Sequence, residues 1–493
     1  MKSGILRCCL VAVLLAGTLS GLPVLLSGGW APAAWAGDDD DSDGGNDSDS
    51  DDDDSDDDGD SDDDDDDGDD DDDRDGRPRA GRGEGGGSDA TTGRTRQVPG
   101  IAQARHDRPV AAPELVTIGL SPADLALLLR EGFIVLEEQD LPGVASDMRR
   151  LSPPTGMSAT QARDRIRRLV SGAASDLNHY YYTNQAPSGA HSVADPICQN
   201  ANCAALELVD WPGPTLRAKQ CQAELPRIGI IDTGINIEHE FLAGARIELH
   251  RLADGDVASA KIHGTAIASM LAAPTGGRVE GLLPEASYLA ADIFSRANGE
   301  ERADAASLIR GLDLMEQRGI RVVNLSLAGP DNAALAQMVA RLVEERDMVL
   351  VAAVGNGGRD RPAAYPAAYP EVIGVTAVDR RGRLYAQAQR GAPVDLAAPG
   401  VGLLLATSIS GARPQTGTSY AVPFVTAAAA LLLADDPGLT SAEVKARLAD
   451  GARDLGAEGR DDLFGSGLLQ AGELCGQLPA PVGLTVSLPS SGL

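Results

Sequence analysis

Short apolar runs alternate with helix-like stretches along the second half of the chain. The runs are typical of strands buried on both faces of a sheet, and they lie at 228–232, 288–292, 321–327, 348–355 and 372–378. The stretches between them show helical spacing of apolar residues, at 264–273, 306–319 and 334–347. This alternation predicts βαβ units, and therefore one α/β domain with a parallel sheet and helices on both faces, over residues 226–475.

A different order of elements precedes that domain. The pattern predicts strands at 114–120, 133–141, 145–153 and 174–182, and helices at 121–132 and 158–170. Ser121 and Ser158 are expected to cap the two helices. The order βαββαβ predicts a small α+β domain of the ferredoxin-like kind over residues 113–182. The tyrosines at 180–182 are expected either in an edge strand or against another domain.

The first 36 residues resemble a secretory signal. Lys2 and Arg7 flank the start of an apolar stretch, and Ala34-Trp35-Ala36 fits a small-x-small cleavage site. We therefore predict a signal peptide over residues 1–36 and a secreted or periplasmic protein. An uncleaved N-terminal membrane anchor is the alternative, because the stretch is long for a signal.

Most of the formal net charge of −32 comes from one segment. Residues 38–75 contain 27 Asp and one Arg. Such a segment buries too little apolar surface to offset its chain entropy, so residues 37–112 are predicted to be a disordered acidic tract followed by a Gly/Arg/Pro linker. A solvated spacer is favoured over a loose calcium binder or surface brush, because the tract lacks a D-x-D-x-D-G loop with a closing Glu.

Four cysteines remain outside the signal: Cys198, Cys203, Cys221 and Cys475. In an exported protein they predict two disulfides. Of the three pairings, Cys198–Cys203 with Cys221–Cys475 is favoured over the others. A four-thiolate zinc site is the alternative, although the spacing lacks paired CxxC elements. Residues 183–225 are predicted to be a cysteine-containing linker, and residues 476–493 a C-terminal tail.

Three polar side chains are predicted to lie at one edge of the parallel sheet. Asp232 ends the run IGIID, His263 begins a helix, and Ser419 precedes the apolar run YAVPFV. Each also has a purely structural interpretation: Asp232 as a turn or cap residue, His263 as a structural histidine and Ser419 as a helix cap. Together they provide what acyl transfer requires, because a serine hydroxyl needs a base to take its proton and the base needs an orienting carboxylate. The order Asp, His, Ser is a known solution.

An oxyanion donor completes this chemistry. Asn356 follows a strand among glycines, and its amide could donate together with the Ser419 backbone N–H. A left-handed turn residue is the alternative for Asn356. The sequences DTGI, HGTAIA, VAAVGN and GTSYAVP resemble the Asp, His, Asn and Ser motifs of the subtilisin-like serine proteases, in order and at similar spacing. The resemblance covers about half of the chain and implies the subtilisin-like fold.

The resemblance also implies roles for these residues. Asp232 would be the carboxylate, His263 the general base and acid, Ser419 the nucleophile and Asn356 the oxyanion donor. NLSLAG (324–329) is similar to the family's substrate-binding edge, with Ala328 in place of a family glycine, and AAVG (352–355) to the opposite wall of the primary pocket. The implied substrate-binding residues are Ser326, Leu327, Ala328, Ala353 and Gly355.

By the same resemblance, residues 113–182 would be a propeptide that assists folding and blocks the site until it is cleaved off between Tyr182 and Cys198. The expected function is a secreted serine endopeptidase that acts on peptides or proteins. The alternative is an inactive exported protein that binds through its acidic tract and N-terminal domain. We expect no cofactor for the chemistry, with structural calcium as an option of unknown ligands. We also expect a monomer that binds no nucleic acid.

Overall fold

The computed structural model describes residues 109–183, 201–213, 224–254 and 257–474. All of these lie in one compact unit of the chain, Thr95–Leu493. The predicted signal, acidic tract, linker at 76–108 and C-terminal tail lie outside the described residues. We call residues 109–183 the N-terminal domain and residues 224–474 the C-terminal domain.

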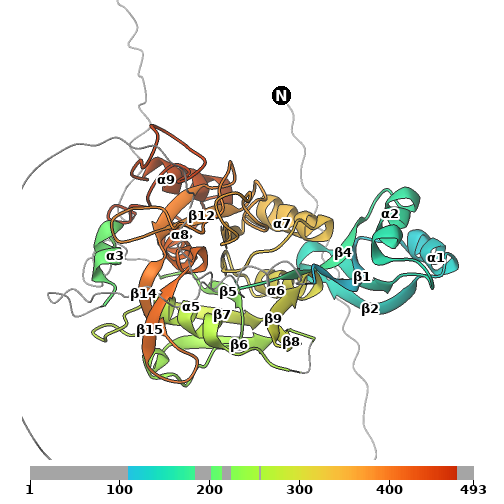
Figure 1. The fold of residues 1–493 in the computed structure, drawn as a ribbon, viewed down its shortest axis with the longest axis horizontal. Helices are drawn as coiled ribbons and strands as arrows, with labels where there is room; N and C mark the ends of the chain where they lie inside the picture. Colours follow the sequence, from blue (N-terminus) through green and yellow to red (C-terminus); the bar gives the residue numbers. More distant parts are fainter. Residues whose placement is uncertain (1–108, 184–200, 214–223, 255–256, 475–493) are drawn as a thin grey trace, which may run out of the picture. The chain divides into compact units, whose positions relative to one another are not determined.

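A seven-stranded parallel sheet forms the centre of the C-terminal domain (Figure 1). Its strands, in spatial order, are β13 (Leu396–Pro399), β12 (Ile373–Val378), β11 (Val349–Ala353), β10 (Val322–Leu325), β5 (Ile228–Asp232), β7 (Ser287–Asp292) and β6 (Arg246–Arg251). Every neighbouring pair is parallel. The five strands predicted from apolar runs are all present. The two edge strands, β6 and β13, were not predicted, because neither forms a long continuous apolar run: RIELHR alternates polar and apolar residues, and LAAP has only four residues.

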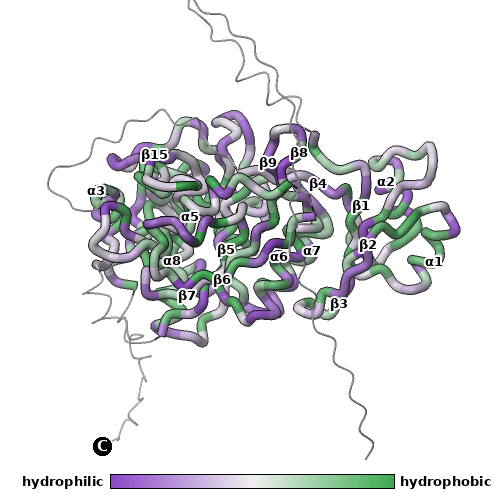
Figure 2. The backbone as a smooth tube through the Cα atoms, turned by 90° about the horizontal axis from the view of Figure 1, so that it is seen from below, coloured by the Kyte–Doolittle hydropathy of each residue, from purple (hydrophilic) through white to green (hydrophobic). Residues whose placement is uncertain are grey.

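Helices cover both faces of this sheet. Helices α5 (Ile262–Ala272) and α8 (Val422–Asp435) pack with one face, and α6 (Ala305–Gln317) and α7 (Ala333–Arg346) with the other. Successive residues of a strand point to opposite faces, so Ile230 packs with the first pair of helices and its neighbour Ile231 with the second. Helix α9 (Ser441–Asp450) packs against α8. Hydrophobic residues therefore run through the centre of the domain (Figure 2).

One stretch, Thr418–Asp435, is long and apolar enough to cross a membrane by length and composition. However, 94% of this stretch is buried inside the protein. The stretch is therefore explained by its place in the core, where α8 contacts strands β10, β11 and β13 and helix α5.

The N-terminal domain contains four antiparallel strands and two helices. In chain order these are β1 (Ala111–Ile118), α1 (Pro122–Arg130), β2 (Ile134–Leu141), β3 (Ser146–Ser152), α2 (Ala159–Leu169) and β4 (Ala174–Tyr181), with a short 3₁₀ turn η1 (Pro142–Val144). The spatial order is β2-β3-β1-β4. Ser121 and Ser158 cap the helices as predicted, and Ser158 forms a capping box with Gln161.

The two faces of the N-terminal sheet pack against different parts of the protein. Leu115 and Leu151 pack with α1 and α2 on one face. Val116 and Met148, on the other face, share a hydrophobic cluster with residues of α6 and α7 of the C-terminal domain. Strand β4 also pairs antiparallel with β9 (Glu300–Asp304), which pairs in turn with β8 (Ser295–Ala297). The tyrosines near the end of β4 therefore pack against the other domain, one of the two predicted outcomes.

Two side chains of β4 reach the N-termini of these helices. Asn178 Oδ1 accepts a hydrogen bond from the Ala306 N–H of α6 at 3.1 Å, and Asp176 Oδ2 accepts one from the Ala333 N–H of α7 at 3.1 Å. The first N–H groups of a helix have no partner within the helix and favour negative charge. The two domains are thus joined by caps as well as by apolar contact.

The predicted linker at 183–225 is partly helical. Helix α3 (Cys203–Leu208) lies within it, and Ala205 and Val209 belong to the core cluster of the C-terminal domain. The prediction of linker was wrong here because a six-residue helix gives too weak a periodic signal. A hairpin of β14 (Val401–Ala406) and β15 (Ala412–Thr416) was also not predicted. Cys203 is disulfide-bonded, but the other three cysteines lie outside the described residues, so their pairing stays a prediction.

Candidate active site

Asp232 and His263 meet at the carboxyl edge of the parallel sheet. Asp232 is the last residue of β5, and His263 is the second residue of α5. The His263 Nδ1 atom lies 2.7 Å from Asp232 Oδ1 and 2.9 Å from Oδ2. Both side chains are buried, at 0% and 1% exposure. The carboxylate therefore fixes the imidazole with Nδ1 toward it and Nε2 directed away.

Thr233 holds Asp232 and the start of α5 in place through two hydrogen bonds. Its N–H donates to Asp232 Oδ1 at 2.7 Å, and its hydroxyl accepts from the Gly264 N–H at 2.8 Å. A side chain at Gly264 would approach the Thr233 carbonyl oxygen to 2.3 Å, so the start of α5 can come this close only with glycine there. Thr233 was not among the predicted site residues, because a threonine between an aspartate and a glycine carries no local signal for such a role.

Ser419 lies in a single 3₁₀ turn, η3 (Thr418–Tyr420), just before α8. Its side chain does not cap α8, because the cap residue of that helix is Ala421 and makes no side-chain bond. Instead, Ser419 Oγ donates to the Ser326 carbonyl oxygen at 3.1 Å. The structural alternative for Ser419, a helix cap, is thus excluded.

The Nε2 atom of His263 has no hydrogen-bond partner within the described part of the chain. A buried polar atom without a partner costs free energy, and proteins often keep such an atom for a catalytic role. Here the atom belongs to an imidazole whose other nitrogen is held by a carboxylate. It is therefore able to accept a proton from an incoming hydroxyl.

Asn356 follows β11 and is held by the residue that precedes Ser419. Its Oδ1 atom accepts from both the Thr418 N–H and the Thr418 hydroxyl, each at 3.0 Å. These two donors assign the carbonyl end of the Asn356 amide, so the NH₂ group points the other way. The left-handed turn predicted as an alternative for Asn356 is not present, since the positive φ of 103° belongs to Gly355.

Gln389 supports the same loop from behind. Its Oε1 atom accepts from the Gly357 N–H at 3.1 Å, and its backbone N–H donates to the Gly355 carbonyl at 3.0 Å. Its Nε2 also donates to the Pro362 carbonyl. Gln389 therefore holds the backbone on both sides of Asn356. The sequence offered no signal for this residue, because a glutamine in a loop is ordinarily a surface residue.

The predicted substrate-binding edge lies beside Ser419. Ser326 Oγ donates to the Ser419 carbonyl at 2.8 Å, so serines 326 and 419 are joined by two hydrogen bonds. Leu327 packs into the hydrophobic core, and Ala353 is buried at the end of β11. Ala328 pairs with the end of the N-terminal domain: the N–H and the carbonyl of Tyr182 bond to the carbonyl and the N–H of Ala328 at 3.0 and 3.1 Å.

A second buried carboxylate lies opposite Asp232 in the sheet. Asp292 ends β7 and is the register partner of Asp232. Burial raises the pKa of Asp292, and hydrogen bonds from the Phe294 N–H and from Arg251 oppose that rise. Ser259 joins Asp292 to the Gly234 N–H, at 3.3 and 2.7 Å. Asp292 therefore supports the loop that follows Asp232, and its hydrogen bonds go to groups other than His263.

Among the described residues there is no group of three or more His, Cys, Asp or Glu side chains arranged to hold a metal ion. Calcium sites therefore stay a prediction without ligands.

An α/β fold with Asp, His and Ser at the carboxyl edge of a parallel sheet is a serine hydrolase arrangement. The subtilase family model matches residues 226–467. Subtilisin DY of Bacillus licheniformis is 31% identical over 264 residues, which are 51% of this chain and 93% of that protein. Subtilisin BL of Lederbergia lenta is 33% identical over 210 residues, covering 42% and 76%. The chain belongs to the subtilase family of subtilisin-like serine proteases.

Two further relatives show the limits of the match. The minor extracellular protease Epr of Bacillus subtilis is 32% identical over 209 residues, and the chain spans 32% of its length. Fervidolysin of Fervidobacterium pennivorans, a keratinolytic enzyme related to subtilisin, superposes with a TM-score of 0.62. That match has 22% identity and covers 76% of this chain and 62% of fervidolysin, so it shows the fold alone.

Proposed function

We propose that the protein is an exported serine endopeptidase that cleaves peptide bonds through an acyl-enzyme. The observation that carries the proposal is the buried Asp232–His263 pair, whose free Nε2 lies at the sheet edge that also holds Ser419. The signal-like residues 1–36 support export, as does the extracellular nature of the relative Epr. The substrate is a peptide or protein, and the working form is proposed to be a monomer.

In the proposed first step, Ser419 Oγ turns from the Ser326 carbonyl to His263 Nε2 and attacks the scissile carbonyl carbon. His263 takes the hydroxyl proton and then gives it to the leaving amine, whose bond to the carbonyl carbon breaks. Asp232 stabilises the imidazolium that exists between these two transfers. Water repeats the sequence on the acyl-enzyme, releasing the acid and restoring Ser419. Such hydrogen bonds are often loose before substrate arrives.

The negative charge on the tetrahedral oxygen is proposed to be held by the Asn356 NH₂ group and the Ser419 backbone N–H. Thr418 and Gln389 fix the Asn356 amide and its loop in advance, so no reorganisation is needed when the charge develops. No metal or other cofactor takes part in these steps.

An Asn356→Ala variant is expected to lower kcat about 10²–10³-fold with little change in KM, a magnitude known from a related subtilisin. The lost donor acts on the transition state and hardly on the bound substrate, so binding is spared. Steady-state kinetics on a fluorogenic peptide measure both constants, and thermal denaturation checks the fold. A well-folded variant with kcat within about fivefold of the parent would exclude Asn356 from this role.

The N-terminal domain is proposed to be an inhibitory propeptide. The proposal is supported by the antiparallel pairing of Tyr182 with Ala328 on the predicted substrate-binding edge. An extended peptide can bind to such an edge as an additional strand, so the end of this domain would occupy the place of a substrate. The same edge carries Ser326, whose carbonyl accepts from Ser419. The cleavage that removes the domain is proposed to lie between Tyr182 and Cys198.

Labelling with a fluorophosphonate probe, followed by intact mass, tests the whole proposal. We expect covalent labelling that disappears in Ser419→Ala, and a mature chain that begins between residues 183 and 198. Labelling without any N-terminal loss would retain the protease and overturn the propeptide. A folded, processed protein that takes no label would overturn the protease and favour the alternative, an inactive exported binding protein.

A further inference from the structure

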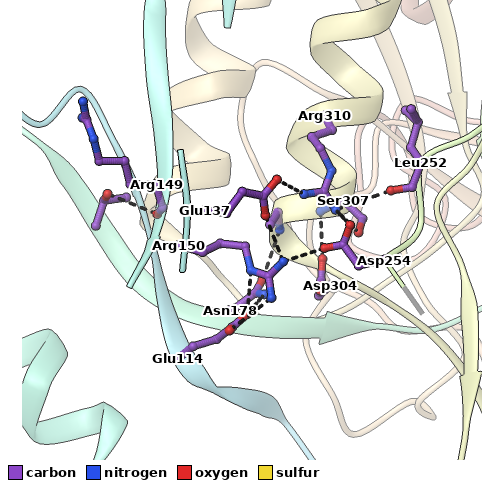
Figure 3. A network of polar contacts seen from close by, with 12 residues as sticks. Glu114, Glu137, Arg149, Arg150, Asn178, Leu252, Asp254, Asp304, Ser307 and Arg310 are labelled. Carbon is purple, nitrogen blue, oxygen red and sulfur yellow. Dashed lines mark hydrogen bonds and ion pairs between the residues drawn. The ribbon is translucent and has the colours of Figure 1, made fainter. Parts of the chain in front are cut away.

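Four charged side chains form a closed ring between the two domains (Figure 3). Arg150 Nη1 lies 2.9 Å from Glu137 Oε2 and 2.6 Å from Asp254 Oδ2. Arg310 closes the ring, with Nη1 at 2.8 Å from Glu137 Oε1 and Nη2 at 2.7 Å from Asp254 Oδ1. The charges alternate around the ring, and each domain contributes one cation and one anion.

The division of contacts makes the ring depend on both domains. Glu137 and Asp254 each give one oxygen to each arginine. Each carboxylate thus has half of its partners in the other domain. Arg310 is the most buried member, at 8% exposure, and Asp254 the least, at 43%. Separation of the domains would leave Arg310 with only one of its two carboxylates.

The two arginines are held in place from within their own domains. Glu114 binds Arg150 with both oxygens, at 2.9 and 3.2 Å, and also accepts from Asn178 Nδ2 at 2.7 Å. Arg310 Nη2 donates to Ser307 Oγ at 2.9 Å. Pre-positioned guanidinium groups lose less entropy when a partner arrives.

Neighbouring carboxylates stabilise the charged form of Arg150. Burial opposes the charge, but hydrogen bonds and the nearby charge of Glu114, together with a hydrogen bond to Glu137, raise the pKa of Arg150 above its ordinary value. The arginine therefore stays charged at any physiological pH. The ring should respond to salt, which screens partly exposed charges.

The apolar part of the interface is less selective. Val116 and Met148 pack with residues of α6 and α7 such as Leu312, and burial of apolar surface is non-directional. Charges across an interface instead determine partner choice, because a mismatched partner leaves buried charges without counter-charges.

We propose that Asp254 and Arg310 form the recognition site by which the C-terminal domain selects its own N-terminal domain as a separate polypeptide. The proposal rests on the proposed removal of that domain. Its partner is identified by chemistry: a sheet face that presents a carboxylate and a guanidinium, Glu137 and Arg150, at matching positions.

The test uses the full chain with Ser419→Ala and a cleavage site for a sequence-specific protease inserted within residues 184–200. The protein is folded, cut, and its two fragments are separated by dilution, with the dissociation constant followed by native mass spectrometry. Because Ser419→Ala removes self-cleavage, the result does not depend on whether the chain is an active protease. A failure of the ring is thus distinguishable from a failure of the proposed function.

We expect Glu137→Gln and Arg310→Gln each to raise the dissociation constant about 10–100-fold. The double variant should be no weaker than the weaker single variant, because the two side chains act on the same contact. Raising sodium chloride from about 50 to about 500 mM should weaken the parent complex at least ~10-fold and the double variant far less.

A matched control is the Glu131–Arg165 pair, 2.7 Å apart and confined to the N-terminal domain. Glu131→Gln should leave the dissociation constant unchanged. Arg310→Lys keeps the charge but cannot reach both carboxylates, so its dissociation constant should lie between those of the parent and of Arg310→Gln. It replaces Arg310→Gln in the test if that variant fails to fold. The proposal would be overturned if the dissociation constants of the single variants stayed within about twofold of the parent, or if the effects of the two substitutions multiplied in the double variant. It would also be overturned if the dissociation constant of the parent complex did not depend on salt.

Discussion

A Ser419→Ala variant is expected to hydrolyse peptide substrates about 10⁶-fold more slowly than the parent, a loss of the size measured in a related subtilisin. The hydroxyl is the only group removed, and without it the acyl-enzyme cannot form. Asn356 and the substrate-binding edge remain, so a small residual rate and an almost unchanged KM are expected. Steady-state kinetics on a fluorogenic peptide measure both.

The N-terminal domain must be removed in the same way from parent and variant. A site for a sequence-specific protease inserted within residues 184–200 achieves this, because it makes processing independent of the enzyme's own activity. Ser269 offers a matched control: it is equally buried, and its hydroxyl bonds the Ala266 carbonyl and the Ala406 N–H. Ser269→Ala should lower stability by about 1 kcal/mol and leave kcat unchanged. A Ser419→Ala enzyme within about tenfold of the parent would refute the assigned nucleophile.

An Asp232→Asn variant is expected to lose about 10⁴-fold in kcat at neutral pH. The amide has nearly the same shape as the carboxylate, but it carries no charge to stabilise the imidazolium. Its NH₂ group also favours the tautomer with the proton on His263 Nε2, which cannot then accept a proton from Ser419. The contacts at 2.7 and 2.9 Å make Asp232 the orienting group of His263 in this structure.

Asp292 provides the matched control for that variant. It occupies the register position opposite Asp232 and is also buried, at 5% exposure, but it contacts Arg251 and Ser259 and no residue assigned to the chemistry. Asp292→Asn should therefore keep kcat in the parent's range. Equal losses in the two variants would mean that Asp232 acts through the stability of the loop and not through His263.

The four positions assigned to the chemistry could be picked out in the sequence because they lie at the ends of strongly marked elements. Asp232 and Asn356 come just after buried strands, whose apolar runs are hard to mistake for other structure. His263 and Ser419 come at or near the start of helices, and in parallel sheets such positions share one edge. The two residues that hold the Asn356 loop and amide, Gln389 and Thr418, were missed because they act only through contacts between segments.

Local pattern determined the strands β5, β7, β10, β11 and β12, the helices between them and the six elements of the N-terminal domain, whereas the four positions assigned to the chemistry also needed the resemblance of their motifs to a known family. Only the tertiary structure decided that Ser419 bonds the Ser326 carbonyl instead of capping α8, that Tyr182 pairs with Ala328, and that β4 pairs with β9. It also decided the charge ring, whose cross-domain pairs are 104 and 173 residues apart in the chain. Periodicity and caps are set by neighbours within one turn or one strand, whereas ion pairs and strand edges depend on which distant surfaces packing brings together.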